Sequence, residues 1–269
     1  MTLTPVALTI AGSDSGGGAG IQADLRTFAF HKVHGTSALT CVTAQNTLGV
    51  TRVDALPPES VAAQMEAVVK DIGVQAAKTG MLLNQEIITI VANQIKALGI
   101  QNLVVDPVMV SRTGAQLIGD QAIASLRSDL VPLATILTPN RYEAQILSGV
   151  EEISTLEEMQ TAAQMIYQLG TKAVLVKGGG MPGSLRGVDV WFDGQQLKTL
   201  VTETVSTTNT HGTGCTLSAA IVANLALGQD PFSATQAAKN YVTTALKYAL
   251  DIGQGQGPVG HFFPLIQSF

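Results

Sequence analysis

Residues 209–215 read Asn-Thr-His-Gly-Thr-Gly-Cys and stand directly before an apolar segment that is typical of a helix. Glycine lets the backbone turn tightly and approach a ligand, and the first turn of a helix presents backbone N–H groups that attract anions. This combination can hold a phosphoryl group while negative charge develops on it. The same residues also fit a plain turn between a loop and a helix, so the spacing alone leaves both interpretations open.

Cys215 would lie in the first turn of this helix, where the helix dipole favours the thiolate form. A reactive sulfur and a buried, inert cysteine are both compatible with that position. His211 stands four residues earlier, which suggests a cysteine hydrolase, yet a residue on a glycine turn need not face the sulfur. The role of the cysteine therefore stays open at this point.

A second glycine-rich run, residues 12–20, holds five glycines in nine positions and follows a short apolar run. It lacks the Lys-Ser/Thr ending of a phosphate-binding P-loop, and no G-x-G-x-x-G register fits it. The run can offer a bare backbone wall to a flat ligand, with Asp24 on the helix that follows. The alternative is a simple turn between a strand and a helix.

Polar side chains follow three further apolar runs. Asn140 and Glu143 are three residues apart at an expected helix start, where their side chains can share one face of the helix. Asp106 and Lys177 each stand at the end of another short apolar run. Carboxylate and amide oxygens suit Mg²⁺, usually through water. Open α/β sheets place ligands at the carboxyl ends of their strands, so we expect these elements to meet in one cleft.

Short apolar runs alternate with longer amphipathic segments along the chain. The runs that predict strands are residues 6–10, 103–105, 136–138 and 173–177. Apolar residues at helical spacing lie between them, around residues 61–72 and 159–166, with Gly99 and Gly170 as expected helix ends. This alternation predicts an α/β fold, with a parallel sheet covered by helices on both faces.

Two regions depart from the alternation. Residues 38–43 and 52–55 stand close together with no helix between them, which suggests a β flap or an irregular sheet edge. Residues 189–192 and 196–201 flank the dipeptide Asp193-Gly194, which is a strong signal for a β-hairpin. Both regions therefore predict antiparallel additions to the sheet.

The C-terminal part of the sequence predicts two more helices, over residues 214–227 and 231–250. The tail that follows, residues 253–260, is rich in glycine, and we expect it to be loose. No linker, charge block or repeat divides the chain. Residues 1–269 are therefore expected to form a single domain.

Composition limits the class of protein. The 269 residues are 46% hydrophobic and only 13% charged, which excludes a largely disordered chain. A net charge of −5 without basic clusters predicts no nucleic-acid or membrane partner. No apolar stretch reaches the about 20 residues of a spanning helix. Cys41 and Cys215 are expected to be free thiols in a reducing cytoplasm.

The chain resembles the hydroxymethylpyrimidine/phosphomethylpyrimidine kinases, a branch of the ribokinase-like superfamily. The likeness covers nearly the whole chain and depends on several separate motifs that occur in the family's order. These motifs are residues 11–24, 43–47, 78–82, 105–109, 138–140, 177–179 and 211–215.

The resemblance implies a three-layer α/β/α kinase that uses ATP and Mg²⁺. Its substrates would be 4-amino-5-hydroxymethyl-2-methylpyrimidine and then the monophosphate of that compound. It would act as a homodimer, in which residues 38–55 could pair or pack across the interface. The wider superfamily usually has Asp where this chain has Cys215, whereas the pyrimidine-kinase branch is similar to this chain in carrying Cys there. The resemblance therefore implies that Cys215 is the general base.

The resemblance also assigns expected roles to the residues around the transferred phosphoryl group. The backbone of Gly212 and Gly214 would form the anion hole, while Thr213 and Lys177 would meet the nucleotide phosphates. The residues expected to serve magnesium are Asn140, Glu143 and Asp106.

Gln45 is expected to read the pyrimidine. A primary amide offers one acceptor oxygen and two N–H donors, which can match a ring nitrogen beside an exocyclic amine. The alternative is a glutamine that caps backbone groups in a sharp turn. The resemblance implies that the rest of the pocket consists of Gly12, Ala19, Asp24, Met81 and Val108.

Three other functions stay open. A pyridoxal kinase of the same superfamily would phosphorylate pyridoxal in preference to the aminopyrimidine. A cysteine hydrolase would be independent of ATP and would form an acyl-thioester. A small-ligand binding protein would bind nucleotide without releasing ADP. The combined phosphate, metal and base candidates favour the kinase.

Overall fold

Strands β1 to β9 form one sheet within residues 4–109 and 116–266, the part of the chain that the computed structural model describes. Their order across the sheet is β3-β2-β1-β4-β5-β6-β7-β8-β9. The strands are β1 (Val6–Asp14), β2 (His34–Gln45), β3 (Val50–Ala55), β4 (Ala76–Thr79), β5 (Leu103–Val105), β6 (Ile136–Leu137), β7 (Val174–Val176), β8 (Asp189–Phe192) and β9 (Leu197–Leu200).

The pairing of these strands confirms the predicted sheet. Neighbours from β2 to β7 run parallel. The outer pairs, β2–β3, β7–β8 and β8–β9, are antiparallel. The flap is therefore the β2–β3 pair at one edge, and the hairpin around Asp193-Gly194 joins β8 to β9 at the other edge.

Helices cover both faces of the sheet. The longer helices are α1 (Gly20–Phe30), α2 (Pro58–Ala67), α3 (Gln85–Ala97), α5 (Arg141–Ser148), α6 (Leu156–Tyr167), α7 (Thr213–Ala226) and α8 (Pro231–Lys247). The shorter segments are α4 (Asp120–Ser125), α9 (Phe263–Ile266), the π turns Val68–Ile72 and Leu126–Leu130, and the 3₁₀ turns Val131–Leu133 and Gly183–Leu185.

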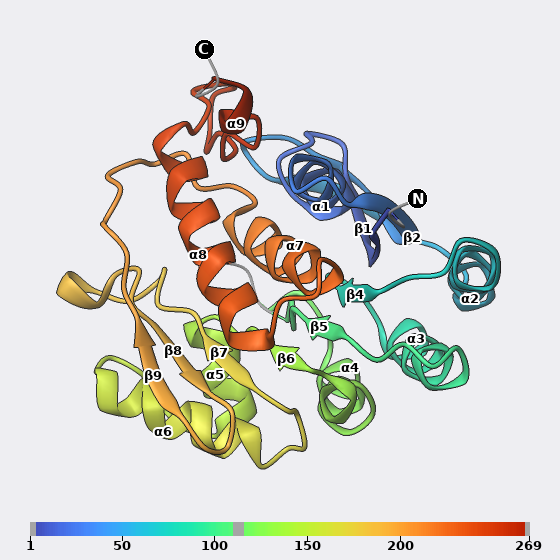
Figure 1. Ribbon diagram of the computed structural model, residues 1–269, viewed down its shortest axis with the longest axis horizontal. Helices are drawn as coiled ribbons and strands as arrows, with labels where there is room; N and C mark the ends of the chain where they lie inside the picture. The colour runs from blue at the N-terminus through green and yellow to red at the C-terminus, as the bar shows by residue number, and fades with distance from the viewer. Residues whose placement is uncertain (1–3, 110–115, 267–269) are drawn as a thin grey trace.

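The core is divided between the two faces because side chains of a strand alternate. On β1, Ala7 packs with α1, α7 and α8 on one face, whereas Leu8 and Ile10 pack with α2 to α6 on the other. In Figure 1, α7 and α8 lie together on one side of the sheet and α2 to α6 run along the other. The predicted three-layer α/β/α architecture is confirmed.

Local signals in the sequence set several helix ends. Asn140 and Glu143 form a reciprocal capping box at the start of α5. Gly99 and Gly170, the predicted helix ends, have positive φ angles of 66° and 102°, which favour glycine. These short-range features needed no knowledge of the tertiary structure.

Two expectations about glycine-rich segments are wrong. Strand β1 continues to Asp14, beyond the predicted residues 6–10, so that Gly12 lies inside the strand rather than in a loop. The tail over residues 253–260 is not loose, because residues 257–260 are buried and bonded. The N–H of His211 donates to Gly257, and the N–H of Val259 donates back to His211.

Two further observations concern the class of protein. Within residues 4–109 and 116–266, no helix is both long and apolar enough to cross a bilayer. Cys41 and Cys215 are both free thiols, as predicted.

Candidate active site

The N-termini of α1 and α7 meet at the centre of the candidate site. Gly212, which precedes α7, has φ +80°, and a Cβ atom there would lie 1.8 Å from the carbonyl oxygen of Gly18. The backbone of Gly20, the first residue of α1, hydrogen-bonds the sulfur of Cys215. The two glycine-rich motifs are therefore in direct contact. Two helix starts therefore lie close together, and the backbone N–H groups at a helix start attract anions.

Asp14 and His211 hold the two glycine loops together. Oδ1 of Asp14 accepts the N–H of Gly16 at 2.8 Å, and Oδ2 accepts that of Ala19 at 2.8 Å. Nε2 of His211 donates to the same Oδ2 at 2.8 Å. Burial acts to raise the pKa of Asp14, but the bonds from His211, Ala19 and Gly16 outweigh it and leave this pKa below its ordinary value.

Gln45 lies at the end of β2, against this loop contact. Its Nε2 atom lies 3.4 Å from Nε2 of His211, and its Oε1 atom lies 3.2 Å from the hydroxyl of Thr43. The side chain is half-buried. Gln45 therefore lies beside the loop before α7, and its contact with a pyrimidine stays a prediction.

Cys215 lies in the first turn of α7 with a half-buried side chain. The expectation that the helix start favours a thiolate is wrong for the free protein, because burial raises the pKa of this thiol to about 11. Lys78 is the strongest influence in the opposite direction. The thiol is therefore neutral at physiological pH before ligands bind, and its role as a base stays a prediction.

Asp24, expected in the substrate pocket, forms a buried ion pair instead of facing open space. Its Oδ1 accepts from Nζ of Lys78 at 2.7 Å and its Oδ2 accepts from the hydroxyl of Thr9 at 2.6 Å, with the Lys78 and Asp24 side chains fully buried. Burial raises the pKa of Asp24, against the effect of Lys78. Direct contact between Asp24 and a substrate stays a prediction.

On the other side of Cys215, Asp106 and Lys177 face the start of α7. Nζ of Lys177 donates to Oδ1 of Asp106 at 2.9 Å, and Ser218 on α7 donates to Oδ2 at 3.3 Å. A Cβ atom at Gly214 would lie 3.5 Å from Nζ of Lys177. Burial acts to lower the pKa of Lys177, but Asp106 and Glu143 keep it above its ordinary value, so this lysine is a cation.

Glu143 completes this charged group at the start of α5. It is 2% exposed, and burial raises its pKa to about 8. Its Oε2 accepts the N–H of Asn140 at 2.7 Å and its Oε1 accepts that of Met109 at 3.4 Å. The side-chain oxygen of Asn140 in turn caps α5, so both residues already serve the helix start.

These donors allow a test of whether Mg²⁺ fits. The described part of the chain contains no group of three or more His, Cys, Asp or Glu residues arranged to hold a metal directly. The carboxylate of Asp106 nevertheless has about four lone-pair sites, and donors from Lys177 and Ser218 occupy only some of them. Glu143, whose pKa is raised to about 8, would have to lose its proton before it joined Asp106. The site therefore fits a Mg²⁺ ion that keeps its water ligands and is bound by the protein through those waters. It does not fit an ion whose ligands are all protein side chains.

The remaining predicted pocket residues lie near the glycine loops. A Cβ atom at Gly12 would lie 2.6 Å from Sγ of Cys41 and 3.2 Å from Cε of Met81, so this position admits little beyond glycine. Ala19 caps α1, Val108 follows β5, and both are half-buried, as is Met81. Thr213 opens α7 and donates its hydroxyl to Thr210 at 2.6 Å. Their contact with ligands stays a prediction.

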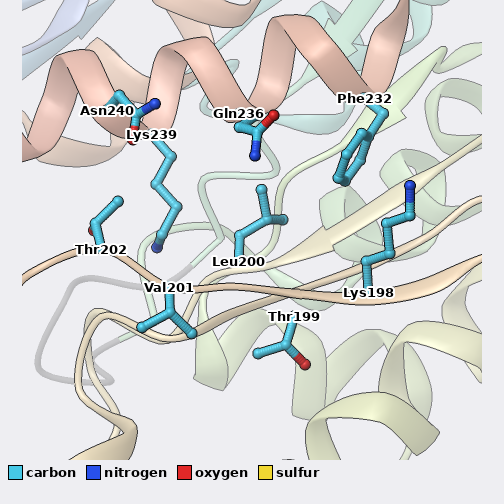
Figure 2. A pocket seen from close by; sticks show the side chains of 9 residues that line it. All are labelled: Lys198, Thr199, Leu200, Val201, Thr202, Phe232, Gln236, Lys239 and Asn240. Carbon is cyan, nitrogen blue, oxygen red and sulfur yellow. The ribbon is translucent and has the colours of Figure 1, made fainter.

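A separate cavity of about 400 Å³ lies between β9 and α8, away from these residues. Figure 2 shows its lining, which contains none of the predicted site residues. Lys239 from this lining donates to Asp189 at 2.6 Å, and Asp189 accepts the N–H of Gly178 at 2.8 Å. This second buried ion pair fixes the loop that follows Lys177.

Sequence reasoning missed three contributors to the site. Asp14 stands alone among glycines, and an acidic residue in such a run signals capping of backbone N–H groups. Lys78 ends an apolar strand run, which marks it as a buried or functional cation. Pro258 lies against Gly18 and pairs with His211, but the tail sequence gives no sign of this long-range contact.

Comparisons with known proteins show what this chain is similar to. The phosphomethylpyrimidine kinase family model matches residues 14–260. The hydroxymethylpyrimidine/phosphomethylpyrimidine kinase of Synechococcus elongatus is 64% identical over 97% of this chain and 98% of its own length.

Solved structures extend the comparison to the fold. Bacillus subtilis pyridoxal kinase in its ADP complex is 41% identical with a TM-score of 0.91, over 96% of this chain and 98% of that one. The phosphomethylpyrimidine kinase of Clostridium difficile 630 is 41% identical with a TM-score of 0.81, over 90% of this chain and 100% of that one. The chain belongs to the phosphomethylpyrimidine kinase family.

Proposed function

We propose that this kinase transfers the γ-phosphoryl group of ATP to 4-amino-5-hydroxymethyl-2-methylpyrimidine, and then a second phosphoryl group to the monophosphate formed. The observation that carries the proposal is the meeting of the α1 and α7 starts around Cys215. Gln45 lies near His211 in the loop before α7, and Lys177, paired with Asp106, lies near Gly214 at the start of α7. The groups proposed to bind the acceptor and the phosphates therefore lie near the same helix start.

In this proposal the backbone around Gly212 and Gly214 receives the transferring phosphoryl group. The N–H groups of a helix start are fixed in place, so they stabilise developing charge without reorganising. Lys177, whose Nζ would lie 3.5 Å from a Cβ atom at Gly214, contacts the nucleotide phosphates at the start of α7. Cys215, in its thiolate form, takes up the proton of the acceptor alcohol as the new P–O bond forms.

Magnesium would be held near Asp106, Glu143 and Asn140 through its water ligands. When bound, it would neutralise charge on the nucleotide phosphates. The protein residues themselves orient Lys177: the 2.9 Å bond from its Nζ to Asp106 aims the ammonium at the start of α7. Positioning and charge stabilisation therefore supply most of the acceleration.

Pyridoxal is the second candidate acceptor. A pyridoxal kinase is 41% identical to this chain with a TM-score of 0.91, so the same fold holds a site for that aldehyde in a related protein. Both compounds are six-membered nitrogen rings with a hydroxymethyl group. An amide at position 45 matches the ring nitrogen and exocyclic amine of the aminopyrimidine as an adjacent pair, which favours that compound.

One assay tests the proposal against its alternatives. ADP release is measured with ATP and magnesium, using the aminopyrimidine alcohol, its monophosphate and pyridoxal in separate reactions. Release with both pyrimidines is expected. Faster release with pyridoxal would replace the proposed substrate, and ADP release from none of the three would reject the kinase assignment. Release with the alcohol alone would limit the enzyme to the first step.

We also propose a homodimer formed through the flap. All residues of β3 are exposed, and β3 is an edge strand with unpaired backbone groups on one side. Val50 is 50% and Val53 41% exposed, and Leu48 in the preceding turn is 68% exposed. A second copy would cover these apolar side chains.

A further inference from the structure

A buried charged pair joins β4 to α1, two elements that pack against α7, and no role has been assigned to its cation. Lys78 on β4 and Asp24 on α1 have fully buried side chains and are joined by a 2.7 Å bond. Most of the surrounding core consists of aliphatic side chains. Removing two charged groups from water costs free energy, and their attraction often does no more than offset this cost. A buried pair therefore adds little to the stability of the fold, which points to a role in function.

A chain of contacts leads from this pair to the sulfur of Cys215. The backbone of Gly20 bonds the sulfur, and Asp24 lies four residues later on the same helix. Residues four apart share one helix face, and helical side chains lean toward the N-terminus of their helix. The carboxylate of Asp24 therefore reaches back below Gly20, and it brings Nζ of Lys78 with it.

The sheet register gives the same location independently. Side chains alternate along β4, and Ala76 packs in the core cluster that contains α7. Lys78, two residues later, therefore projects to the α7 face of the sheet. Its backbone pairs with Thr9 of β1, whose hydroxyl bonds the same Asp24. Two neighbouring strands and one helix thus converge on Nζ of Lys78.

Four charged groups face Cys215 from the elements packed around it. Lys78 on β4 and Lys177 after β7 favour a negative sulfur, whereas Asp24 on α1 and Asp106 after β5 oppose it. Each lysine is paired with a carboxylate, Lys177 with Asp106 and Lys78 with Asp24. Lys78 is the fully buried one of the two, so water screens its charge least.

We propose that Lys78 is a positioning residue of the transfer site: its ammonium, held by Asp24, stabilises the thiolate of Cys215. The inference rests on the proposed function of Cys215 as the base. The resting thiol first gives its proton to water. During transfer the S–H bond then forms again as the alcohol O–H bond breaks, the alcohol oxygen bonds to phosphorus, and the bond from phosphorus to ADP breaks. Lys78 keeps its protons throughout and supplies only charge.

Thiol alkylation tests this proposal without requiring catalysis. The full-length chain is treated with iodoacetamide between pH 7.5 and 10.5, and the adduct on the Cys215 peptide is followed by mass spectrometry. Only the thiolate reacts, so the rate reports the ionised fraction. Lys78→Met is expected to slow alkylation by about tenfold or more at pH 8.5, since a neighbouring cation lowers a pKa by about one to three units.

Two further variants keep the test decisive. Lys78→Met leaves the buried Asp24 carboxylate without its partner and can prevent folding, so the double variant Lys78→Met/Asp24→Asn removes both charges. It is expected to react more slowly than the native chain and faster than Lys78→Met. Ile95→Ala shortens a buried side chain of α3, in the core cluster on the other face of the sheet, and should leave the rate at Cys215 unchanged.

The outcomes separate this inference from the proposed function. Native rates in both Lys78 variants would overturn the role of Lys78, even in a chain that releases ADP with the aminopyrimidine. Equal slowing in Ile95→Ala would also overturn it, because any loss of core packing would then have the same effect. Absence of ADP release by the native chain would reject the proposed function instead, whatever the alkylation rates.

Discussion

Replacement of Gly212 by alanine tests whether the contact between the two glycine loops sets the phosphate site. Gly212 has φ +80° and ψ 4°, and an added methyl group would lie 1.8 Å from the carbonyl oxygen of Gly18. Contacts of a Cβ atom below 3.0 Å are essentially absent from proteins. One of the two loops must therefore move by about 1.2 Å, the difference between these distances.

The expected effect on catalysis is larger than the effect on stability. A left-handed conformation costs a non-glycine residue about 1–2 kcal/mol, which a domain of this size can tolerate. A displacement of about 1 Å at reacting groups can lower the rate by about 100-fold. We therefore expect Gly212→Ala to fold, and to lose about 100-fold in kcat/KM for the pyrimidine.

Gly149 provides a matched control for the backbone conformation. It ends α5 with φ 80° and ψ 7°, nearly the angles of Gly212, but an added Cβ there would meet nothing within 4 Å. Gly149→Ala should therefore lose similar stability in urea unfolding and keep native kcat and KM. A Gly212→Ala enzyme with native kcat/KM, or equal activity losses in both variants, would refute the reasoning.

Four shorter predictions follow. Cys215→Ala should lower kcat sharply and leave pyrimidine affinity by calorimetry nearly unchanged; near-native turnover would remove the base assignment. Gln45→Ala should raise KM for the pyrimidine far more than KM for ATP, and equal increases would make this side chain structural. Val53→Glu at the exposed flap should shift the mass in light scattering from dimer to monomer. Burial depresses the pKa of His261 to about 4, below the 6.5 of free histidine, so the unfolded chain takes up the proton first as pH falls. The contribution of His261 to the free energy of unfolding should thus fall by about 2 kcal/mol between pH 7 and 5. The His261→Gln variant should lack this part of the dependence of stability on pH.

Features that depend on neighbours in the chain were predictable from the sequence. Strands such as β5, over Leu103–Val105, are buried on both faces and therefore read as short continuous apolar runs. Asn140 and Glu143 stand three apart at the start of α5, which is the spacing of a capping box. The β8–β9 hairpin follows from Asp193-Gly194. In each case a few adjacent residues contain the whole signal.

The C-terminal tail shows where this reasoning fails. Glycines there were interpreted as a source of flexibility, but they allow close packing: a Cβ atom would lie 2.0 Å from the carbonyl oxygen of Thr47 at Gly255, and 1.9 Å from that of Leu250 at Gly257. Glycine composition alone cannot separate these two uses, because the difference depends on partners that are distant in the sequence.

The charge state of Cys215 shows a second limit, since two physical effects of opposite sign act on one thiol. The helix start favours the thiolate and can be inferred from sequence, whereas burial favours the neutral thiol and depends on the assembled fold. Burial prevails in the free protein, where the pKa is about 11.

A neutral resting thiol must lose its proton before it can act as the base in phosphoryl transfer. The transition state is loose, so the acceptor alcohol needs little activation before the new bond forms. A thiol of high pKa is ionised in a smaller fraction of the molecules, but its thiolate is a stronger base. These two effects on the rate of proton transfer partly cancel. A neutral thiol is also less readily oxidised than a thiolate. A buried cation such as Lys78 can therefore assist proton transfer at Cys215 without keeping a reactive thiolate exposed between turnovers.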